Sequence, residues 1–464
     1  MERSLREEDL MRIIIVGCGK VGHTLAEHLS NENHEVTMID VNSQTLQDAI
    51  GILDVSGVVG NGTSYRTQVE AGVEEADLLI AVTDRDEINL LSCLIAKKAG
   101  KCQTIARVRN PEYYEEINFI KEELGLSMSI NPEWAAASEI ARLIHYPSAF
   151  EVDTFAKGKV NLLRIQIPEG SVLDHMKLME FPSKVSRDVL ICIVERQDEV
   201  IIPNGSFELL EGDMISIILP MEKAFHFFRQ IGIQTKPIKN VLIAGGGTIS
   251  YYLAKQLEKS KVKTKIIEAD RKRCEDLSEA LPDTMIIHGD ATDKQLLLEE
   301  GIVEVDAMAA LTNLDEENIM LSLYAHQVSS AKKTMTKINK INFEEVIREL
   351  PIGSMICPKN ITAEYIIRYV RSMQNSFNSS NVEALYRMAN GRVEALEFKV
   401  GENAKVIRKP LMELSLKDNL LICSISRKGI ILTPGGKDQI LPGDGVIVVT
   451  THKGLNGIDD IIRD

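Results

Sequence analysis

Three glycines are spaced in a pattern that could hold a phosphate group. The motif Gly17-x-Gly19-x-x-Gly22 directly follows the apolar run Ile13 to Val16 and precedes a stretch with the apolar period of a helix. In such a turn the first glycine permits the sharp bend, the second lets a pyrophosphate approach the backbone, and the third lets helix and strand pack closely. Unpaired N–H groups at the start of the helix then face the phosphates. The motif predicts a dinucleotide or adenine-nucleotide site, although glycines needed only for packing would give the same spacing.

Polar side chains follow the other predicted strands of this region. Asp40 ends the second strand, where a carboxylate accepts hydrogen bonds from ribose hydroxyls and disfavours a 2′-phosphate. Asn61 and Thr83 follow the third and fourth strands, and Arg107 follows the apolar segment Thr104 to Ala106. Ligands bind at the carboxyl edge of such sheets, so these side chains could line an adenosine or contact a phosphate. The alternative stays open that Asn61 and Thr83 are turn and capping residues and that Arg107 is solvated.

The second half of the chain repeats this pattern with changes. Gly245-Gly246-Gly247-Thr248-Ile249-Ser250 aligns with the first glycine motif, and Glu268 aligns with Asp40. Serine is small enough for the third glycine position, and glutamate can still reach a ribose. Whether this second site binds a nucleotide or is a degenerate, empty copy is left open. The remaining counterparts are Asp290 for Asn61, Thr312 for Thr83, and Lys337, which offers only a point charge, for Arg107.

The pattern of predicted helices and strands changes once within each half. Apolar runs alternating with helical periods predict an α/β, doubly wound parallel sheet, and the following short β-like runs with Gly, Pro and Asp turns predict a small α+β lobe. Linkers are expected near 234–239 and 375–381. The predicted domains are a first Rossmann-like N-lobe (1–133), a connecting helix (134–150), a first C-lobe (151–235), a second N-lobe (236–358), a connecting helix (359–381) and a second C-lobe (382–464).

Composition narrows the function classes. The formal net charge of −15 offers no broad footprint for nucleic acid. The apolar runs are far shorter than the roughly 20 residues of a membrane-spanning helix, and Met1 to Leu10 lack the features of a signal peptide, which favours the cytoplasm. The 7 cysteines are scattered without metal-ligand spacing and are interpreted as structural thiols, with no metal site.

No catalytic group is predicted. His23 and His145 belong to no arrangement with a carboxylate and a nucleophile, and no large substrate domain is present to supply a general acid or base. We therefore expect a protein that is not an enzyme. Three classes remain: a transport regulator, an NAD-linked oxidoreductase with a duplicated Rossmann domain, and an interaction scaffold with vestigial nucleotide folds.

Several segments together resemble the TrkA family, the peripheral subunits of Trk potassium uptake systems, whose tandem units are regulator-of-potassium-conductance (RCK) domains. The resemblance covers nearly the whole chain beyond residues 1–10. It rests on the segments Ile13 to Gly22, Ala81 to Asn89, Ala106 to Arg109 and Arg142 to Pro147.

The resemblance implies N-lobes that bind NAD(H) or ATP and ADP as regulatory ligands. It also implies a homo-oligomer, a tetramer with a ring of RCK units, docked on a TrkH-type potassium-translocating membrane subunit at the inner face of the plasma membrane. Ser250 and Lys337 depart from the family pattern. Carried over, the site residues are Gly17, Gly19, Lys20, Val21, Gly22, Asp40, Asn61, Thr83 and Arg107, with Gly245, Gly247, Glu268, Asp290 and Thr312 in the second half.

Overall fold

The computed structural model describes residues 10–463 apart from several short segments. The segments left out are 147–150, 156–159, 198, 221–222, 234–236, 330, 332, 340–345, 348–349, 378–381, 390–391 and 456. Residues 234–236 and 378–381 of the two predicted linkers therefore lie outside the described residues. The described chain divides into two units, one formed by 1–141 with 239–369 and the other by 142–238 with 370–464.

The first parallel sheet has the strand order β3-β2-β1-β4-β5-β6, in which the order reverses between β1 and β4. This is the doubly wound topology that the sequence predicts, and ligands bind at its point of reversal. The strands are β1 (Arg12–Val16), β2 (Glu35–Asp40), β3 (Ser56–Val59), β4 (Leu78–Ala81), β5 (Gln103–Arg107) and β6 (Met128–Ile130). The helices are α1 (Lys20–Asn31), α2 (Ser43–Ile50), α3 (Tyr65–Glu70), α4 (Asp86–Ala99), α5 (Pro111–Glu115) and α6 (Ile117–Leu124).

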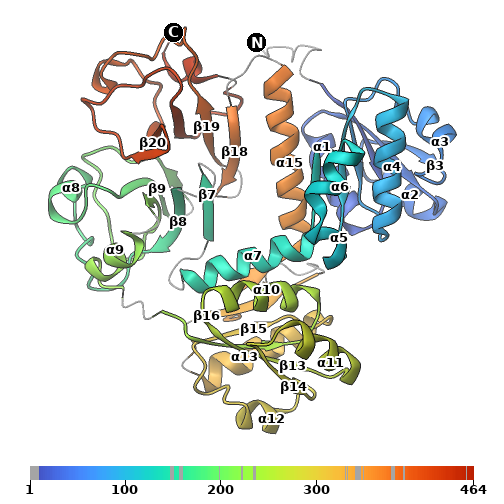
Figure 1. The fold of residues 1–464 in the computed structure, drawn as a ribbon. Coiled ribbons are helices and arrows are strands. Elements are labelled where there is room, and N and C mark those ends of the chain that lie inside the picture. Colours follow the sequence, from blue (N-terminus) through green and yellow to red (C-terminus); the bar gives the residue numbers. More distant parts are fainter. Residues whose placement is uncertain are drawn as a thin grey trace. The chain divides into compact units, whose positions relative to one another are not determined.

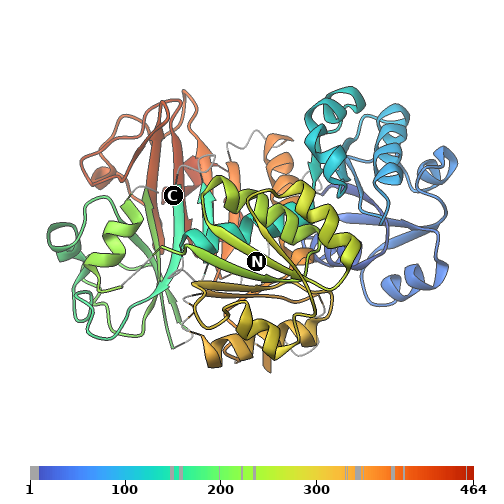
Figure 2. The same cartoon turned by 60° about the horizontal axis from the view of Figure 1, so that its bottom comes forward.

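The second parallel sheet repeats the first, with the order β14-β13-β12-β15-β16-β17 and helices on both of its faces (Figure 2). The prediction of two Rossmann-like sheets is confirmed. The strands are β12 (Asn240–Ala244), β13 (Lys263–Glu268), β14 (Met285–His288), β15 (Ala307–Ala310), β16 (Lys333–Lys337) and β17 (Ser354–Ile356). The helices are α10 (Thr248–Lys259), α11 (Arg271–Ala280), α12 (Lys294–Glu299) and α13 (Asp315–Val328).

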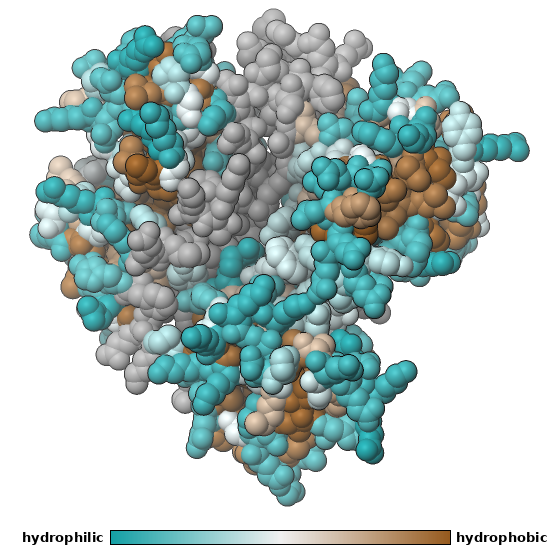
Figure 3. All heavy atoms as spheres, viewed as in Figure 1, coloured by the Kyte–Doolittle hydropathy of each residue, from teal (hydrophilic) through white to brown (hydrophobic). Residues whose placement is uncertain are grey.

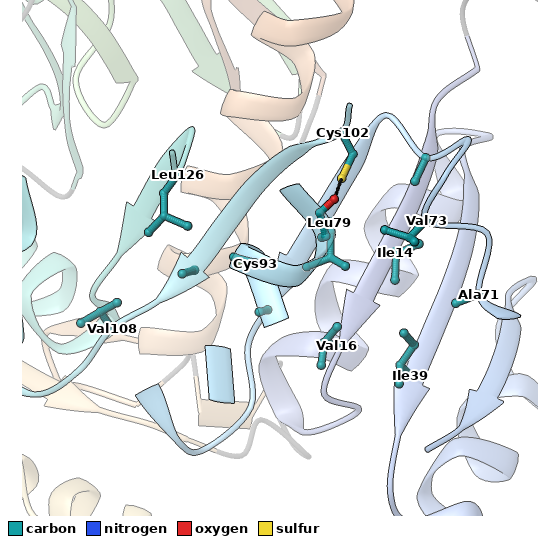
Figure 4. Packing of buried hydrophobic residues seen from close by; sticks show 14 residues of the cluster. Ile14, Val16, Ile39, Ala71, Val73, Leu79, Cys93, Cys102, Val108 and Leu126 are labelled. Atoms are coloured by element: carbon teal, nitrogen blue, oxygen red, sulfur yellow. Dashed lines mark hydrogen bonds between the residues drawn. The ribbon is translucent and has the colours of Figure 1, made fainter. Parts of the chain in front are cut away.

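The core of the first sheet forms because its central strands are apolar on both faces. Ile14, Val16 and Leu79 are almost fully buried and pack with Cys93 and Cys102 (Figure 4). The Cys102 thiol contacts the Ala96 carbonyl at 3.8 Å. All seven cysteines are buried thiols, which agrees with their interpretation as structural residues.

Two helices connect the parallel sheets with the smaller lobes, and each packs against the other half of the repeat. Helix α7 (Pro132–His145) overlaps the predicted connecting helix 134–150, of which residues 147–150 lie outside the described residues. It lies along α10 of the second half, where Gln256 Nε2 donates to Ser138 Oγ at 3.2 Å (Figure 1). Helix α15 (Pro358–Phe377) reaches the first half, where the Tyr369 hydroxyl donates to Gln103 Oε1 at 2.6 Å. The two N-lobes are thus joined in one compact unit.

Each smaller lobe contains a five-stranded antiparallel sheet, as the α+β prediction requires. The second unit contains both lobes. The first lobe has β7 (Glu151–Phe155), β8 (Val160–Gln166), β9 (Leu190–Arg196), β10 (Glu199–Ile201), β11 (Met214–Pro220), the 3-10 helix η3 (Leu178–Glu180), α8 (Phe181–Lys184) and α9 (Ala224–Gln230). The second has β18 (Val382–Met388), β19 (Val393–Lys399), β20 (Leu420–Arg427), β21 (Ile430–Leu432), β22 (Gly445–Thr450), η5 (Leu411–Glu413) and η6 (Ile458–Ile461).

An ion pair with a buried carboxylate fixes the same turn in both antiparallel lobes. Asp213 is 3% exposed and its carboxylate accepts from Arg196 Nε at 2.7 Å and from the Leu210 amide at 2.8 Å. Asp444 makes the same contacts with Arg427 and Leu441 in the second lobe. In both lobes the aspartate follows a glycine, as Gly212-Asp213 and Gly443-Asp444, so this repeated Gly-Asp dipeptide marks a structural feature of the lobes. Among the described residues, no helix combines the length and the apolar character needed to cross a membrane.

Candidate functional site

The first glycine motif forms the tight turn between β1 and α1. Gly17 has a φ of +104°, and a Cβ there would lie 3.0 Å from the Thr83 amide nitrogen. A Cβ on Gly22 would lie 1.9 Å from the Gly17 carbonyl oxygen, so this position admits no side chain without a shift of the loop. A Cβ on Gly19 would meet no atom within 4 Å. Gly19 is therefore free of steric demands from the protein, and the space beside it is available to a ligand.

Asp40 is held by the backbone around the glycine turn. Its Oδ2 accepts a hydrogen bond from the Cys18 amide at 2.6 Å, and its Oδ1 accepts one from the Asn42 amide at 2.8 Å. Burial and the nearby Asp40 raise the pKa of the Cys18 thiol to about 11, so this cysteine stays protonated beneath the loop. Asp40 thus links β2 to the turn and still faces the cavity described next.

A cavity of about 760 Å³ opens at the carboxyl edge of the first sheet and also reaches the second half. Its size is in the range of small-molecule and cofactor sites. Of the predicted residues, it is lined by Gly17, Gly19, Lys20, Val21, Asp40, Asn61, Thr83, Arg107 and Gly247. Gly22, Gly245, Glu268, Asp290 and Thr312 are not among its lining residues.

Arg107 points into this cavity from the end of β5. Its Nη1 donates to the Thr83 carbonyl at 3.2 Å, and Glu133 lies 4.0 Å from its Nη2. Burial lowers the pKa of Arg107, which nevertheless remains a cation. The Nε group is buried and has no hydrogen-bond partner within the described part of the chain. An unpaired buried donor of this kind suits a phosphate oxygen.

Asn61 and Thr83 shape the loops that border the cavity. Asn61 Oδ1 accepts from the amide and the hydroxyl of Thr63, at 3.0 and 2.9 Å, so Asn61 has the turn role left open above in addition to its place in the cavity. Thr83 donates from its hydroxyl to Asn89 Oδ1 at 2.7 Å. Asn89 is fully buried, and its amide group also donates to the carbonyls of Thr83 and Arg107, at 3.2 and 3.0 Å. Asn89 therefore connects the ends of β4 and β5.

The second glycine turn has different side-chain contacts. The Ser250 hydroxyl donates to the Gly245 carbonyl at 2.5 Å, and Arg273 Nε donates to the Gly246 carbonyl at 2.7 Å. Glu268 accepts from the Gly246 amide at 2.6 Å, in the manner of Asp40. The Lys337 ammonium group donates a hydrogen bond to the Thr312 carbonyl at 3.0 Å, and Lys337 also lines the shared cavity. The second turn thus has the backbone form of the first with more of its polar groups paired internally.

The comparisons with known proteins agree with this repeated architecture. The TrkA-N domain model matches residues 13–132 and 241–358, and the TrkA-C domain model matches 162–232 and 395–463. Together these matches cover most of the chain and both of its halves. The chain belongs to the TrkA family.

Relatives in the TrkA family align over nearly the whole chain. A Trk system potassium uptake protein TrkA homolog from Archaeoglobus fulgidus is 34% identical over 98% of this chain and 100% of its own length. The Trk system potassium uptake protein TrkA of Haemophilus influenzae is 32% identical over 96% of both chains. Among solved structures, the GsuK channel bound to NAD aligns with a TM-score of 0.63 at 17% identity, over 96% of this chain and 78% of that chain. The GsuK RCK domain aligns with a TM-score of 0.61. These structures share the fold.

Several residues in or beside the cavity were not predicted from the sequence, and four of them carry polar groups that matter for the site. Arg109, Glu133 and Lys359 line the cavity, and Asn89 supports it from below. Asn89 left a signal, because the internal repeat of this sequence aligns it with Asn318, which holds Thr312 and Lys337 in the same way. Arg109 lay inside a segment of the family resemblance, whereas Glu133 is the last residue of the predicted first N-lobe and Lys359 the first of the second predicted connecting helix.

Replacing Asn89 with alanine is expected to weaken ligand binding at the first site by about tenfold. The change removes the hydrogen bonds that align Thr83 with Arg107, each of which contributes roughly 1 kcal/mol. Titration calorimetry with NADH and ATP would measure the loss. Asn318→Ala is the matched control, because it removes the same bonds from the second half; an equal loss of binding in both variants would contradict a positioning role for Asn89 at the first site.

Proposed function

We propose that this chain is a cytoplasmic regulatory subunit that senses an adenine nucleotide and gates a Trk-type potassium uptake channel or transporter. The observation that carries the proposal is the cavity at the first glycine turn, which residues of both N-lobes line. A ligand there contacts both halves of the repeat, so it can stabilise one arrangement of the halves over another. Membership in the TrkA family supplies the class of transport system.

The chemistry of the cavity supports a nucleotide with phosphates. The N-terminus of α1 carries unpaired N–H groups and a partial positive charge, and Lys20 and Arg107 add two full charges beside it. NAD(H), ATP and ADP are the ligands that we propose for this site. Among the solved structures similar to this chain, one is the GsuK channel bound to NAD and another is GsuK bound to ADP.

The mechanism requires a ligand with different affinities for two arrangements of the protein. A ligand that binds both arrangements equally shifts nothing, whereas a hundredfold preference supplies about 2.7 kcal/mol toward one of them. The membrane partner that we propose is a TrkH-type potassium-translocating subunit at the inner face of the plasma membrane. Ligands with different phosphate content would then set different open fractions of the pore.

A ligand panel read beside a turnover assay tests this function. We expect ATP, ADP, NADH or NAD to raise the melting temperature, with about 2.7 kcal/mol of stabilisation at a ligand concentration of 100 Kd. We expect no consumption of NADH in the same samples, and potassium flux through vesicles holding the membrane partner should change with the ligand. Steady NADH turnover would instead support an oxidoreductase, and a protein that ignores every nucleotide would be a scaffold.

We also propose that the chain assembles as a homotetramer through helices α4 and α6. Apolar side chains gather over these helices (Figure 3), where Leu91 is 46% and Phe119 is 63% exposed. Met320 is 65% exposed at the position of α13 that corresponds to Leu91. Exposed apolar areas of this kind mark contact surfaces.

Replacing Phe119 with glutamate is expected to reduce the assembly to a smaller species, because a charge at an apolar contact must be desolvated. Light scattering on the eluting peak of a sizing column would give the mass. Met179→Glu is the control, since Met179 is 67% exposed on the antiparallel lobe, away from α4 and α6 in the sequence. An unchanged mass for Phe119→Glu would contradict this contact.

A further inference from the structure

The two helices that begin at the cavity carry opposite charges at equivalent positions. Helix α7 begins with Pro132 and Glu133, and helix α15 begins with Pro358 and Lys359. All four residues line the cavity. The repeat therefore presents an acceptor-only group from one half and a donor-only group from the other. Such a cavity distinguishes the two ends of an asymmetric ligand.

Glu133 has one oxygen that is paired and one that is not. Its Oε1 accepts from Arg109 Nε at 2.7 Å, and its side chain is only 12% exposed. Its Oε2 is buried and lacks a hydrogen-bond partner within the described part of the chain. Buried carboxylate oxygens normally accept a hydrogen bond, so an unpaired one that borders a cavity indicates a donor on the ligand.

The other cationic groups of the cavity are placed to bind the phosphates, whereas the second oxygen of Glu133, Oε2, has no hydrogen-bond partner among the described residues. Lys20 and Gly19 stand at the start of α1, and Lys337 and Lys359 face the same space from the second half. The terminal phosphate of a nucleoside triphosphate presents ionised oxygens, which accept hydrogen bonds and would be repelled by a carboxylate. A dinucleotide carries a second nucleoside beyond its pyrophosphate, with ribose hydroxyls that can donate.

We infer that Glu133 is a specificity-determining residue, which accepts a hydrogen bond from the second nucleoside of a dinucleotide and so favours NAD(H) over ATP. This inference rests on the proposed function, because it concerns the ligand of the same site. Lys359 has the complementary role of attracting phosphate. The asymmetry between Glu133 and Lys359 then explains why the two halves of the repeat do not offer equivalent sites to one ligand.

The experiment compares the affinities of NADH and ATP for the full chain in buffer containing EDTA. For the unaltered protein we expect tighter binding of NADH. Glu133→Ala should lower the NADH to ATP affinity ratio about tenfold, because a hydrogen bond to a charged group is lost for NADH and a repulsion is relieved for ATP. Glu133→Gln keeps an acceptor oxygen and should restore part of the NADH affinity. Melting curves without ligand show whether each variant remains folded.

Lys359→Gln is the matched control from the other half. It should weaken NADH and ATP together, since both ligands carry phosphates, and should leave their ratio closer to that of the unaltered protein. A ratio that is unchanged in both folded Glu133 variants would overturn the inference while leaving nucleotide sensing intact. ATP binding that requires Mg²⁺ and loses this requirement in Glu133→Ala would also overturn it, by making Glu133 a cation ligand. Failure of the unaltered protein to bind either nucleotide would instead overturn the proposed function itself.

Discussion

Replacing Gly19 with valine is expected to abolish nucleotide binding at the first site while the protein stays folded. A side chain at this position meets no protein atom within 4 Å of its Cβ, and the φ of −69° is accessible to any residue. The branched side chain would instead occupy the space where phosphate oxygens approach the amides of α1. We expect the dissociation constant of NADH to rise at least a hundredfold, about 2.7 kcal/mol, with a change in melting temperature of only a few degrees.

Gly247→Val is the matched variant in the second half. Gly247 has the same extended backbone and an equally open Cβ direction, so both substitutions place similar demands on the fold. Titration calorimetry of the two variants would show how much of the binding belongs to each glycine turn. If Gly19→Val bound NADH with the affinity of the unaltered protein, the phosphates would not lie at the α1 N-terminus.

Replacing Asp213 with alanine is expected to destabilise the first antiparallel lobe by about 3 kcal/mol. The carboxylate is nearly fully buried and accepts hydrogen bonds from Arg196 and from the Leu210 amide, so its loss leaves a guanidinium and an amide without their acceptor. Hydrogen exchange of the β11 amides and the urea midpoint of the intact protein would report the change. Nucleotide binding at the N-lobes should be unaffected.

The control for this variant removes an exposed ion pair from the same lobe. Asp188 pairs with Lys223 at 2.6 Å, but both side chains are about half exposed. Asp188→Ala should therefore cost no more than about 1 kcal/mol. Equal losses in the two variants would show that the Asp213 pair contributes no more than a surface contact. The equivalent variant Asp444→Ala should repeat the larger loss in the second lobe.

The sequence predicted those parts of the fold that leave local patterns. Apolar runs and the glycine motif at residues 17–22 predicted both parallel sheets. The Gly-Asp dipeptide at 212–213 and 443–444 is also visible in the sequence, and it stands at the same turn of each antiparallel lobe. The arginine partners of that turn left no pattern, because Arg196 and Arg427 come from strands that pair with it only in the folded lobe. A local periodic pattern predicts a helix or a strand. It does not show which side chain from a distant part of the chain contacts that element.

The candidate site was predicted less completely for the same reason. Eight of the nine residues carried over for the first half line the cavity, while Gly22 supports the turn from inside. The contribution of Glu133 and Lys359 depends on how the two N-lobes meet, and neither residue stands in a motif. Asp40 was expected to face a ribose, and its bonds to the Cys18 and Asn42 amides show a structural role that spacing alone does not reveal.

Helices α7 and α15 each pack against the opposite half of the repeat, and this exchange bears on how two such halves come to share one polypeptide. If the two halves were separate molecules, each would lend its helix to the other, and the pair would be a swapped dimer held together only at sufficient concentration. Joining them in one polypeptide makes that encounter intramolecular, so it no longer depends on the protein concentration. The covalent link also ensures that a first half always pairs with a second half. The two halves can therefore carry different residues at equivalent positions, as Glu133 and Lys359 do.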